Sequence, residues 1–575
     1  MKKSFLTKLT SVMLSVLMIF SICACDGNSQ SVNYPKNGAR KIIDTEKIFY
    51  VSLEMNQPLS VAHYENQEEI LLMEINSAVT EFINEMALGR YDGTSVEVEE
   101  TDSMVKLTRE NGAYCEIDFV KDTVLFSDFD TFNKKGDAIN PHDMLSSAYL
   151  NEEGENIFIK REKSFFTPGY SIEIDLAERD IPLDIYGGKK YIPLQTFNDL
   201  FISPYGINIA YNGQALFLLV GNTLSADLED MYYLDEPTPR TSALAEFNYN
   251  ELCLALDLYY GLQGEHGFNN GFSDYLEKIG LKEELLKPDA IHAFNALSTL
   301  TLGYIADGHS GVVGASPYLG ARQPQSGASV EIAPEIIEKI ENGEMYKSAR
   351  EEQLGEVYFY QKVGNTAYVT FDEFTLGDRS AGYENALQVG DTLTIIMAAH
   401  AQISQDEEIE NVVVDLSCNG GGAVDSAIYL TAWMLGSCNF STYNSITESK
   451  ATTTYAVDVN LDGVFDENDT ITDKNLYCIV SPVSFSCGNY VPALLKASGK
   501  VTIWGKTSNG GGCVVRQTVL ADGTLFSMSS AYQMSIVRNG SYYGVDQGVE
   551  PDVVLSKIES FYDRVALTDY INDLK

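Results

Sequence analysis

The chain has 575 residues, which is too long for one hydrophobic core, so we expect two to four domains. Its 45% hydrophobic and 21% charged content is typical of a folded globular protein. The 82 Asp and Glu residues outnumber the 39 Lys and Arg residues, giving a formal net charge of -43. A field of that sign repels phosphate backbones, so we expect no nucleic-acid partner.

The N-terminus has the pattern of a secretory signal. Three early lysines are followed by Leu9–Ala24, an apolar run without a charge. The end of this run resembles a lipobox, in which cleavage precedes a cysteine that carries diacylglycerol, here Cys25. We therefore expect a lipoprotein signal peptide over residues 1–24, a polar tether over 25–39, and a chain anchored at the extracellular face of the cell membrane. Ordinary secretion and an uncleaved signal anchor are the alternatives.

The cysteines predict neither a disulfide framework nor a zinc ribbon. Beyond Cys25 seven remain, an odd number, and no C-x-x-C pair occurs among them.

Residues 40–235 are expected to form a mostly β accessory domain. Alternating runs such as AYCEIDFV and ALFLLVGN are typical of short strands, with a helix predicted over Glu68–Gly89. Within 185–220, the stretch YIPLQTFNDLF resembles a small repeat of bacterial cell-wall stalk domains. No catalytic chemistry is visible in this domain.

The periodicity changes after residue 245. Apolar residues at helical spacing predict a helical part and linker over 245–360. Strands then alternate with helices over 361–556, which predicts an α/β core, and residues 557–575 form a C-terminal helix. The expected class is thus an α+β or α/β multidomain protein. Within the core, we expect a strand over Asn411–Leu416, and a strand and helix on either side of Ser486.

Four motifs occur in a fixed order in this half of the chain. They are DGHS (307–310), VVVDLSCNGGG (412–422), YCIVSPVSFSCGNYVPALL (477–495), and the pair TIWGKTSNGGG (502–512) and DQGVEPDVVL (546–555). Together they resemble the tail-specific-protease and tricorn family of serine peptidases, over about residues 245–556. The resemblance implies a crotonase-like ββα peptidase core preceded by a helical part, a peptide or protein substrate, and no cofactor for catalysis.

The serine within SFSCG has the setting of a nucleophile. Ser486 follows a hydrophobic strand and precedes an apolar helix, whose free N–H groups and dipole stabilise anions. The N–H of Cys487 is expected to face a developing oxyanion. The second donor is expected from the NGGG loop, at Gly420 or alternatively Gly421. A plain helix-capping role for Ser486 is the alternative.

The base and its partner come from the resemblance. Ser-Lys members of the family carry a lysine in the turn that here reads Gly510–Gly512, and Lys506 lies in a different stretch. His309 matches the position of the base in tricorn-type members, which implies a Ser-His-acid mechanism. Asp546 is the expected carboxylate that orients the histidine, with Glu550 as the alternative.

Several positions depart from the family pattern. Asn489 stands where Ser-Lys relatives often have Glu, and Ser417 stands where the family commonly has Arg, which puts substrate anchoring by that side chain in doubt. Only about fifty residues separate His309 from Val363, too few for the PDZ module that many relatives insert there.

One acidic stretch follows the D-x-N-x-D-G pattern of calcium loops, between flanks that read as strands. We expect a structural calcium site there, with an Asx-rich hairpin tip as the alternative. The expected ligands are Asp458, Asn460, Asp462, Asp466 and Asp469.

The sequence therefore predicts a surface-anchored serine endopeptidase. The competing prediction is a catalytically inactive peptide- or ligand-binding lipoprotein on the same fold, since fold does not fix function.

Overall fold

The computed structural model describes residues 40–85, 95–136, 138–146, 156–233, 239–268, 271–323, 330–379 and 381–574. The predicted signal peptide, tether and Cys25 lie outside these residues. The described chain confirms the mixed α+β, multidomain class, and it divides into two compact units. Of the described residues, unit 1 takes those in 40–136, 170–333 and 515–531, and unit 2 takes those in 138–169, 334–514 and 532–574.

These units cross the boundaries expected from the sequence. Strand β8 (Ile159–Thr167), from the predicted accessory domain, pairs with β19 (Lys450–Val457) in unit 2. Conversely, residues 515–531 of the predicted peptidase core belong to unit 1. Periodicity reports only the local state of the chain, and neither of these long-range pairings leaves a local signal.

Unit 1 is built on two sheets. A seven-stranded sheet has the order β10-β11-β3-β2-β1-β13-β12, and a five-stranded antiparallel sheet has the order β4-β5-β6-β7-β9. Side chains of β5 and β6 alternate between buried and half-buried, as a sheet with one covered face requires. The strands are β1 (Ile42–Tyr50), β2 (Asn56–Tyr64), β3 (Gln67–Glu74), β4 (Val96–Glu100), β5 (Met104–Arg109), β6 (Tyr114–Asp118), β7 (Thr123–Phe126), β9 (Ile172–Asp175), β10 (Asp184–Tyr186), β11 (Lys189–Pro193), β12 (Ile207–Tyr211) and β13 (Leu216–Val220).

The helix predicted over Glu68–Gly89 is wrong in its first half. Residues Gln67–Glu74 form β3, which closes a hairpin with β2 through Asn66, whose φ is 71°. Helical structure begins only at Ile75. Pairing on both sides of β3, with β2 and β11, overrides the helical propensity of its Glu, Leu and Met residues.

The predicted helical part of the chain is present in unit 1. Helix α6 (Ser242–Tyr259) begins at Thr241, whose hydroxyl accepts the N–H of Leu244 at 3.1 Å. Helix α10 (Ala290–Thr299) continues into a π-helical turn, Leu300–Ile305, that ends just before the DGHS motif. Strand β14 (Gly311–Gly314) follows the motif and pairs with the first residues of β23 (Leu525–Arg538).

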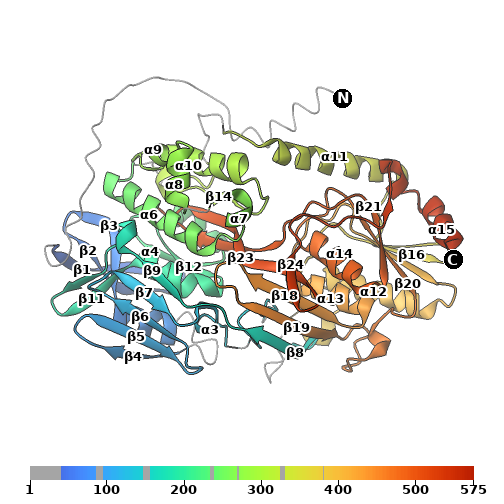
Figure 1. The fold of residues 1–575 in the computed structure, drawn as a ribbon, viewed down its shortest axis with the longest axis horizontal. Coiled ribbons are helices and arrows are strands. Elements are labelled where there is room, and N and C mark those ends of the chain that lie inside the picture. Colours follow the sequence, from blue (N-terminus) through green and yellow to red (C-terminus); the bar gives the residue numbers. More distant parts are fainter. Residues whose placement is uncertain are drawn as a thin grey trace. The chain divides into compact units, whose positions relative to one another are not determined.

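Unit 2 contains a six-stranded sheet of order β15-β16-β17-β20-β21-β25, parallel except for the edge strand β15. Figure 1 shows its helices α13 and α14 side by side. The strands and helices predicted beside the NGGG loop and on either side of Ser486 are confirmed to within a residue or two. The C-terminal helix predicted over 557–575 is shorter, because α-helix begins only at Arg564. The elements are β15 (Tyr360–Val363), β16 (Thr366–Thr370), α12 (Thr392–Gln405), β17 (Asn411–Asp415), α13 (Val424–Leu435), β18 (Cys438–Asn444), β20 (Asn475–Val480), α14 (Cys487–Ser498), β21 (Val501–Gly505), β24 (Ser541–Gly544), β25 (Val553–Val554) and α15 (Arg564–Asp573).

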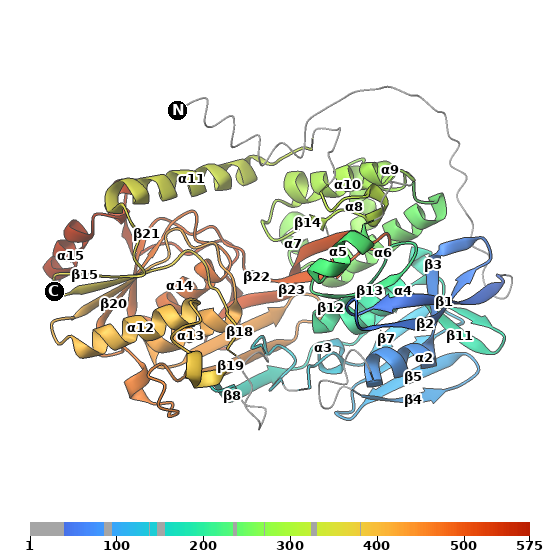
Figure 2. The ribbon, with the colours of Figure 1, turned by 180° about the vertical axis from the view of Figure 1, so that it is seen from behind.

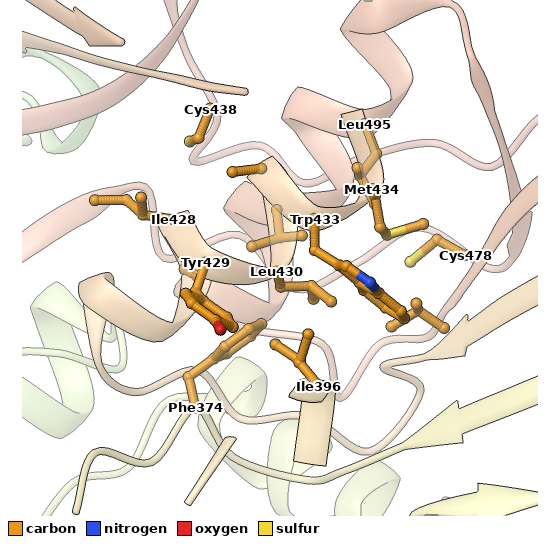
Figure 3. Close-up of a cluster of buried hydrophobic side chains, with 14 of the residues drawn as sticks. Phe374, Ile396, Ile428, Tyr429, Leu430, Trp433, Met434, Cys438, Cys478 and Leu495 are labelled. Carbon is orange, nitrogen blue, oxygen red and sulfur yellow. The ribbon is translucent and has the colours of Figure 1, made fainter. Parts of the chain in front are cut away.

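The main core of unit 2 lies between this sheet and its helices. Figure 3 shows Trp433 and Leu430 of α13 packed with Ile396 of α12, Cys478 of β20 and Leu495 of α14. All five are almost fully buried. This core fixes the strand ends and the start of α14, and therefore the loops that leave the sheet there.

The polar stretch before the sheet contains a helix that the sequence did not reveal. Helix α11 (Pro334–Leu354) is continuous over its whole length in Figure 2. It lies within the segment between His309 and Val363, which is too short for a PDZ module.

Two further findings concern the described residues only. None of their helices has the length and apolarity needed to cross a membrane. Their seven cysteines are all buried, and none of them forms a disulfide.

Candidate active site

The motif-bearing loops of unit 2 that follow β17 and β20 leave the same edge of its sheet. Strands β16, β17, β20 and β21 are neighbours and run parallel, so the segments that follow them start side by side. In open α/β sheets, the region beyond the carboxyl ends of the strands is where sites form. The SFSC turn follows β20 and the NGGG loop follows β17.

Ser486 has a strained backbone. Its φ is 57° and its ψ is -122°, a conformation that non-glycine residues rarely adopt and that costs about 1–3 kcal/mol. The N–H of Ser486 donates to the carbonyl of Gly510 at 2.9 Å, which helps to hold the turn. A sharp strand-to-helix turn of this kind is how some hydrolases expose a nucleophilic serine.

The side chain of Ser486 does not cap its helix. Ser486 is the residue before α14, yet its hydroxyl makes no capping hydrogen bond, and the residue is partly exposed. The simple capping interpretation of this serine therefore fails. Nearby Ser484 is different, because it is fully buried and its hydroxyl donates to the carbonyl of Leu416 at 2.7 Å.

Cys487 is not an alternative nucleophile. Its thiol is buried and donates to the carbonyl of Gly422, and burial raises the pKa of the thiol to about 12. The thiolate required for attack is thus absent near neutral pH. Its backbone N–H, in contrast, is at the first position of α14, where helix N–H groups lack intrahelical acceptors.

Of the two candidate glycines, Gly421 is the one beside Ser486. A Cβ added to Gly421 would lie 2.6 Å from the Cβ of Ser486 and 3.1 Å from its Oγ, whereas a Cβ on Gly420 would meet nothing within 4 Å. The N–H of Gly420 already donates to the carbonyl of Asp372 at 3.0 Å. The N–H of Gly421 likewise donates, to Oδ1 of Asn419 at 2.9 Å, so the choice between the two glycines rests on their distance from Ser486. That distance favours Gly421, the alternative, over Gly420.

The segment Phe371–Phe374, for which the sequence predicted no role, sets the path of the NGGG loop (Asn419–Gly422, here called the glycine loop). Phe374 donates its N–H to the carbonyl of Gly421 at 2.7 Å, and Asn419 donates its side-chain amide to the carbonyl of Phe371 at 3.1 Å. A Cβ on Gly422 would be 2.3 Å from the carbonyl oxygen of Phe374, so only glycine fits. The one signal available was that Phe371–Phe374 follows a predicted strand.

Asp546 lies against the loop that holds Ser486. Its Oδ1 accepts the N–H of Gly512 at 2.7 Å, two residues after the carbonyl that accepts the N–H of Ser486. Glu550 is exposed, and its carbonyl accepts from Lys496 in the last turn of α14. At 1.5 Å of rise per residue, that turn is roughly 14 Å from the start of the helix, so Asp546 is favoured over Glu550.

Asn489 and Ser417 have structural partners. The buried amide of Asn489 donates to the carbonyl of Val545 at 2.9 Å and accepts from the hydroxyl of Ser508 at 2.7 Å. It thereby ties α14 to the residue preceding Asp546. Ser417 is fully buried, with its hydroxyl 3.2 Å from that of Tyr562, so it offers no side chain to a substrate.

His309 belongs to unit 1, in a tightly braced turn. The π-helical turn before it ends at Ala306, with a φ of 50°. Asp307 then accepts the N–H groups of His309 and Ser310 at 2.9 and 2.7 Å, and Ser527 donates to the carbonyl of His309 at 2.9 Å. The backbone on both sides of the imidazole is therefore fixed within its unit.

The acidic loop of unit 2 is held by its own amides. Asp458 accepts the N–H groups of Leu461 and Gly463 and the hydroxyl of Tyr383, while Asp469 accepts the N–H groups of Val459 and Asn460. Among the residues described, no group of three or more His, Cys, Asp or Glu side chains is placed to hold a metal. The calcium site stays a prediction. The strand expected after the loop is wrong, because strand structure resumes only at Asn475.

Residues 365–555 match the model of Peptidase family S41. A curated protein from Chlamydia pneumoniae is 28% identical over 103 residues, which are 18% of this chain and only 16% of that protein.

Solved structures give distant likenesses. A candidate peptidase from Parabacteroides merdae has 16% identity and a TM-score of 0.40, covering 58% of this chain and 97% of the other. A lipoprotein from Streptococcus agalactiae has 14% identity and a TM-score of 0.35, covering 60% and 99%. A photosystem II D1 C-terminal processing protease has 17% identity and a TM-score of 0.26, covering 35% and 47%.

The assignment rests on the family match, since the structural likenesses are too low to add to it. Residues 365–555, about a third of the chain, are thus similar to peptidase family S41, and this match supports a serine peptidase.

Proposed function

We propose that this protein is a serine endopeptidase in which Ser486 attacks the peptide carbonyl. The observation that carries the proposal is the strained turn at Ser486, whose hydroxyl lies at the start of α14 without capping it. Strain of this kind persists where the surrounding structure enforces it, and it gathers at active sites. The family match over residues 365–555 supports the same reaction class.

In the proposed mechanism His309 takes the proton of Ser486 and later returns it to the leaving amine, and Asp546 orients the imidazole. The N–H groups of Cys487 and Gly421 stabilise the oxyanion. The support for Cys487 is its position at the first turn of α14, and the support for Gly421 is its contact with Ser486. The support for His309 is the DGHS motif and its braced turn.

We also propose that the substrate is a peptide or protein and that the enzyme is held at the extracellular face of the membrane through a lipid on Cys25. The support is the sequence pattern that ends at this cysteine. Replacing Cys25 by Ala should move the protein out of the membrane fraction. Retention there would point to an uncleaved anchor instead.

The test is labelling of the full chain, in mild detergent, with a fluorophosphonate probe that reacts with activated serines. Ser486→Ala and His309→Ala should abolish labelling. Ser498→Ala is the matched control, because it alters a serine at the other end of the same helix, and it should label like wild type.

Each outcome has a distinct meaning. Labelling that survives in Ser486→Ala would show that another serine is the nucleophile. Labelling that survives only in His309→Ala would exclude this histidine as the base. A wild type that never labels would favour a protein that binds peptides or other ligands without hydrolysis.

A further inference from the structure

We propose that Arg350, which lies outside all the recognised motifs, is a positioning residue for the glycine loop beside Ser486. The inference rests on the proposed function for its catalytic consequence. The chain of contacts behind it lies wholly within unit 2, and it can be tested without any assay of activity.

The first link is an ion pair of two parallel hydrogen bonds. Nη1 and Nη2 of Arg350 lie 2.6 Å from Oδ1 and Oδ2 of Asp372, respectively. The Arg350 side chain is only 8% exposed, so its charge is shielded from water and depends on this partner. A guanidinium that grips both carboxylate oxygens fixes the orientation of the carboxylate as well as its position.

The second link joins Asp372 to the glycine loop. The carbonyl of Asp372 accepts the N–H of Gly420, and two residues later the N–H of Phe374 meets the carbonyl of Gly421. Residues 372–374 therefore fix the backbone path of the glycine loop through these two hydrogen bonds. A shift of Asp372 would be passed directly to Gly420 and Gly421, and so to the peptide that faces Ser486.

The third link is the rigidity of the helix that carries Arg350. One turn earlier, Tyr346 of α11 is 1% exposed, and its ring meets that of Phe561 edge-on at 5.2 Å. Residues four apart share a helix face, so Tyr346 and Arg350 point to the same side. Near its other end, α11 places Nζ of Lys339 3.0 Å from the centre of the Phe485 ring.

Helix α11 thus contacts the residue before Ser486 directly and reaches the glycine loop through Asp372. Lys339 contacts Phe485, the residue before Ser486, and Arg350 binds Asp372, whose carbonyl accepts the N–H of Gly420. These two residues are about 16 Å apart along the helix, which Figure 2 shows as one unbroken element. A single continuous helix therefore fixes the distance between Phe485 and Asp372.

The experiment compares Arg350→Ala and Arg350→Lys with Arg161→Ala. Arg161 forms a comparable, largely buried ion pair with Asp143 in the same unit, and the other oxygen of Asp143 accepts from Tyr455, which is not part of the glycine loop. We expect Arg350→Ala to lower kcat, and the rate of fluorophosphonate labelling per folded molecule, by about 10- to 100-fold, with KM changed less than about 3-fold. Arg350→Lys keeps the charge but loses the fork, so it should fall between. Arg161→Ala should label within about 2-fold of wild type.

Hydrogen exchange of the segment 411–424 gives a readout that needs no activity. Loss of the Arg350 anchor should speed exchange of the Gly420 amide about 10-fold or more, whereas Arg161→Ala should leave that segment unchanged. Unchanged exchange in Arg350→Ala, or unchanged kcat in a folded and active Arg350→Ala, would overturn the proposal. An unlabelled wild type with faster exchange in Arg350→Ala would instead refute the peptidase function and keep the positioning role.

Discussion

The contrast between Gly421 and Gly420 gives the sharpest test of the site geometry. The two glycines are adjacent, and replacing each by Ala adds one methyl group. In Gly421→Ala that methyl would lie 2.6 Å from the Cβ of Ser486, about 0.8 Å short of the 3.4 Å at which ordinary contact begins. In Gly420→Ala it would meet nothing within 4 Å, at an exposed position.

The expected magnitudes follow from these distances. Gly421 has a φ of +104°, a conformation that costs about 1–3 kcal/mol for alanine, and relief of the overlap costs about as much again. Gly421→Ala should therefore lose about 2–5 kcal/mol of stability, while Gly420→Ala should stay within about 0.5 kcal/mol of wild type. Because Ser486 must move by most of an ångström, we expect its reaction rate to fall about 100-fold.

The assay is the second-order rate of fluorophosphonate labelling, measured well below the melting temperature of each variant so that all are folded. Thermal unfolding, followed in parallel, gives the stability difference. If Gly421→Ala labels within about 3-fold of Gly420→Ala, then Gly421 does not abut the reactive serine and the oxyanion assignment is wrong.

Three further predictions concern other carboxylates. Asp546→Asn should reduce kcat by up to about 10⁴-fold, as expected for the orienting acid of a triad, while Glu550→Gln should reduce it less than about 3-fold; equal effects would contradict the assignment. Asp199 in unit 1 is 2% exposed, and burial raises its pKa from 3.8 to about 6, so it contributes stability that is complete below pH 3.8 and lost as the pH rises through 6. Relative to Asp199→Asn, the wild type should gain up to about 3 kcal/mol between pH 7 and pH 4, measured by urea unfolding; a constant difference would show that the carboxyl is not perturbed. Asp458→Asn should cost about 1–3 kcal/mol in the presence of chelator, since one of the two oxygens that accept backbone N–H groups becomes an NH₂ group that cannot accept. A rise in melting temperature on adding calcium that only the wild type shows would support the calcium loop.

Much of unit 2 could be predicted from local patterns. The run before Ser486 is a continuous apolar strand, and the residues after it have helical spacing, so both elements and the turn between them were visible. The parallel order of the strands is not local, but ordered motifs after successive strands made it a reasonable expectation. The backbone strain at Ser486, in contrast, has no sequence signature beyond the motif.

The features that the sequence could not predict depend on the path of loops and on contacts between residues distant in the chain. Gly420 and Gly421 are chemically identical, and only the path of the loop decides which of them faces the serine. Helix α11 buries only Tyr346 and Arg350 of its side chains, so most of its positions face water and many of them are Glu. With so few apolar contacts, no amphipathic stripe marks it as part of a packed structure.

The departure at Ser417 has a counterpart elsewhere in the chain. Asp415, at the end of β17, is buried and needs a cation, because an isolated buried carboxylate is strongly unfavourable. That cation is Arg564 of the C-terminal helix, whose Nη2 lies 2.5 Å from Oδ2 of Asp415 and whose guanidinium stacks over the ring of Tyr368 at 4.5 Å. Ser417, where the family resemblance leads one to expect an arginine, is itself fully buried. The segment after residue 556 is therefore an integral part of the peptidase unit, because it supplies the charge that stabilises the strand end from which the glycine loop departs.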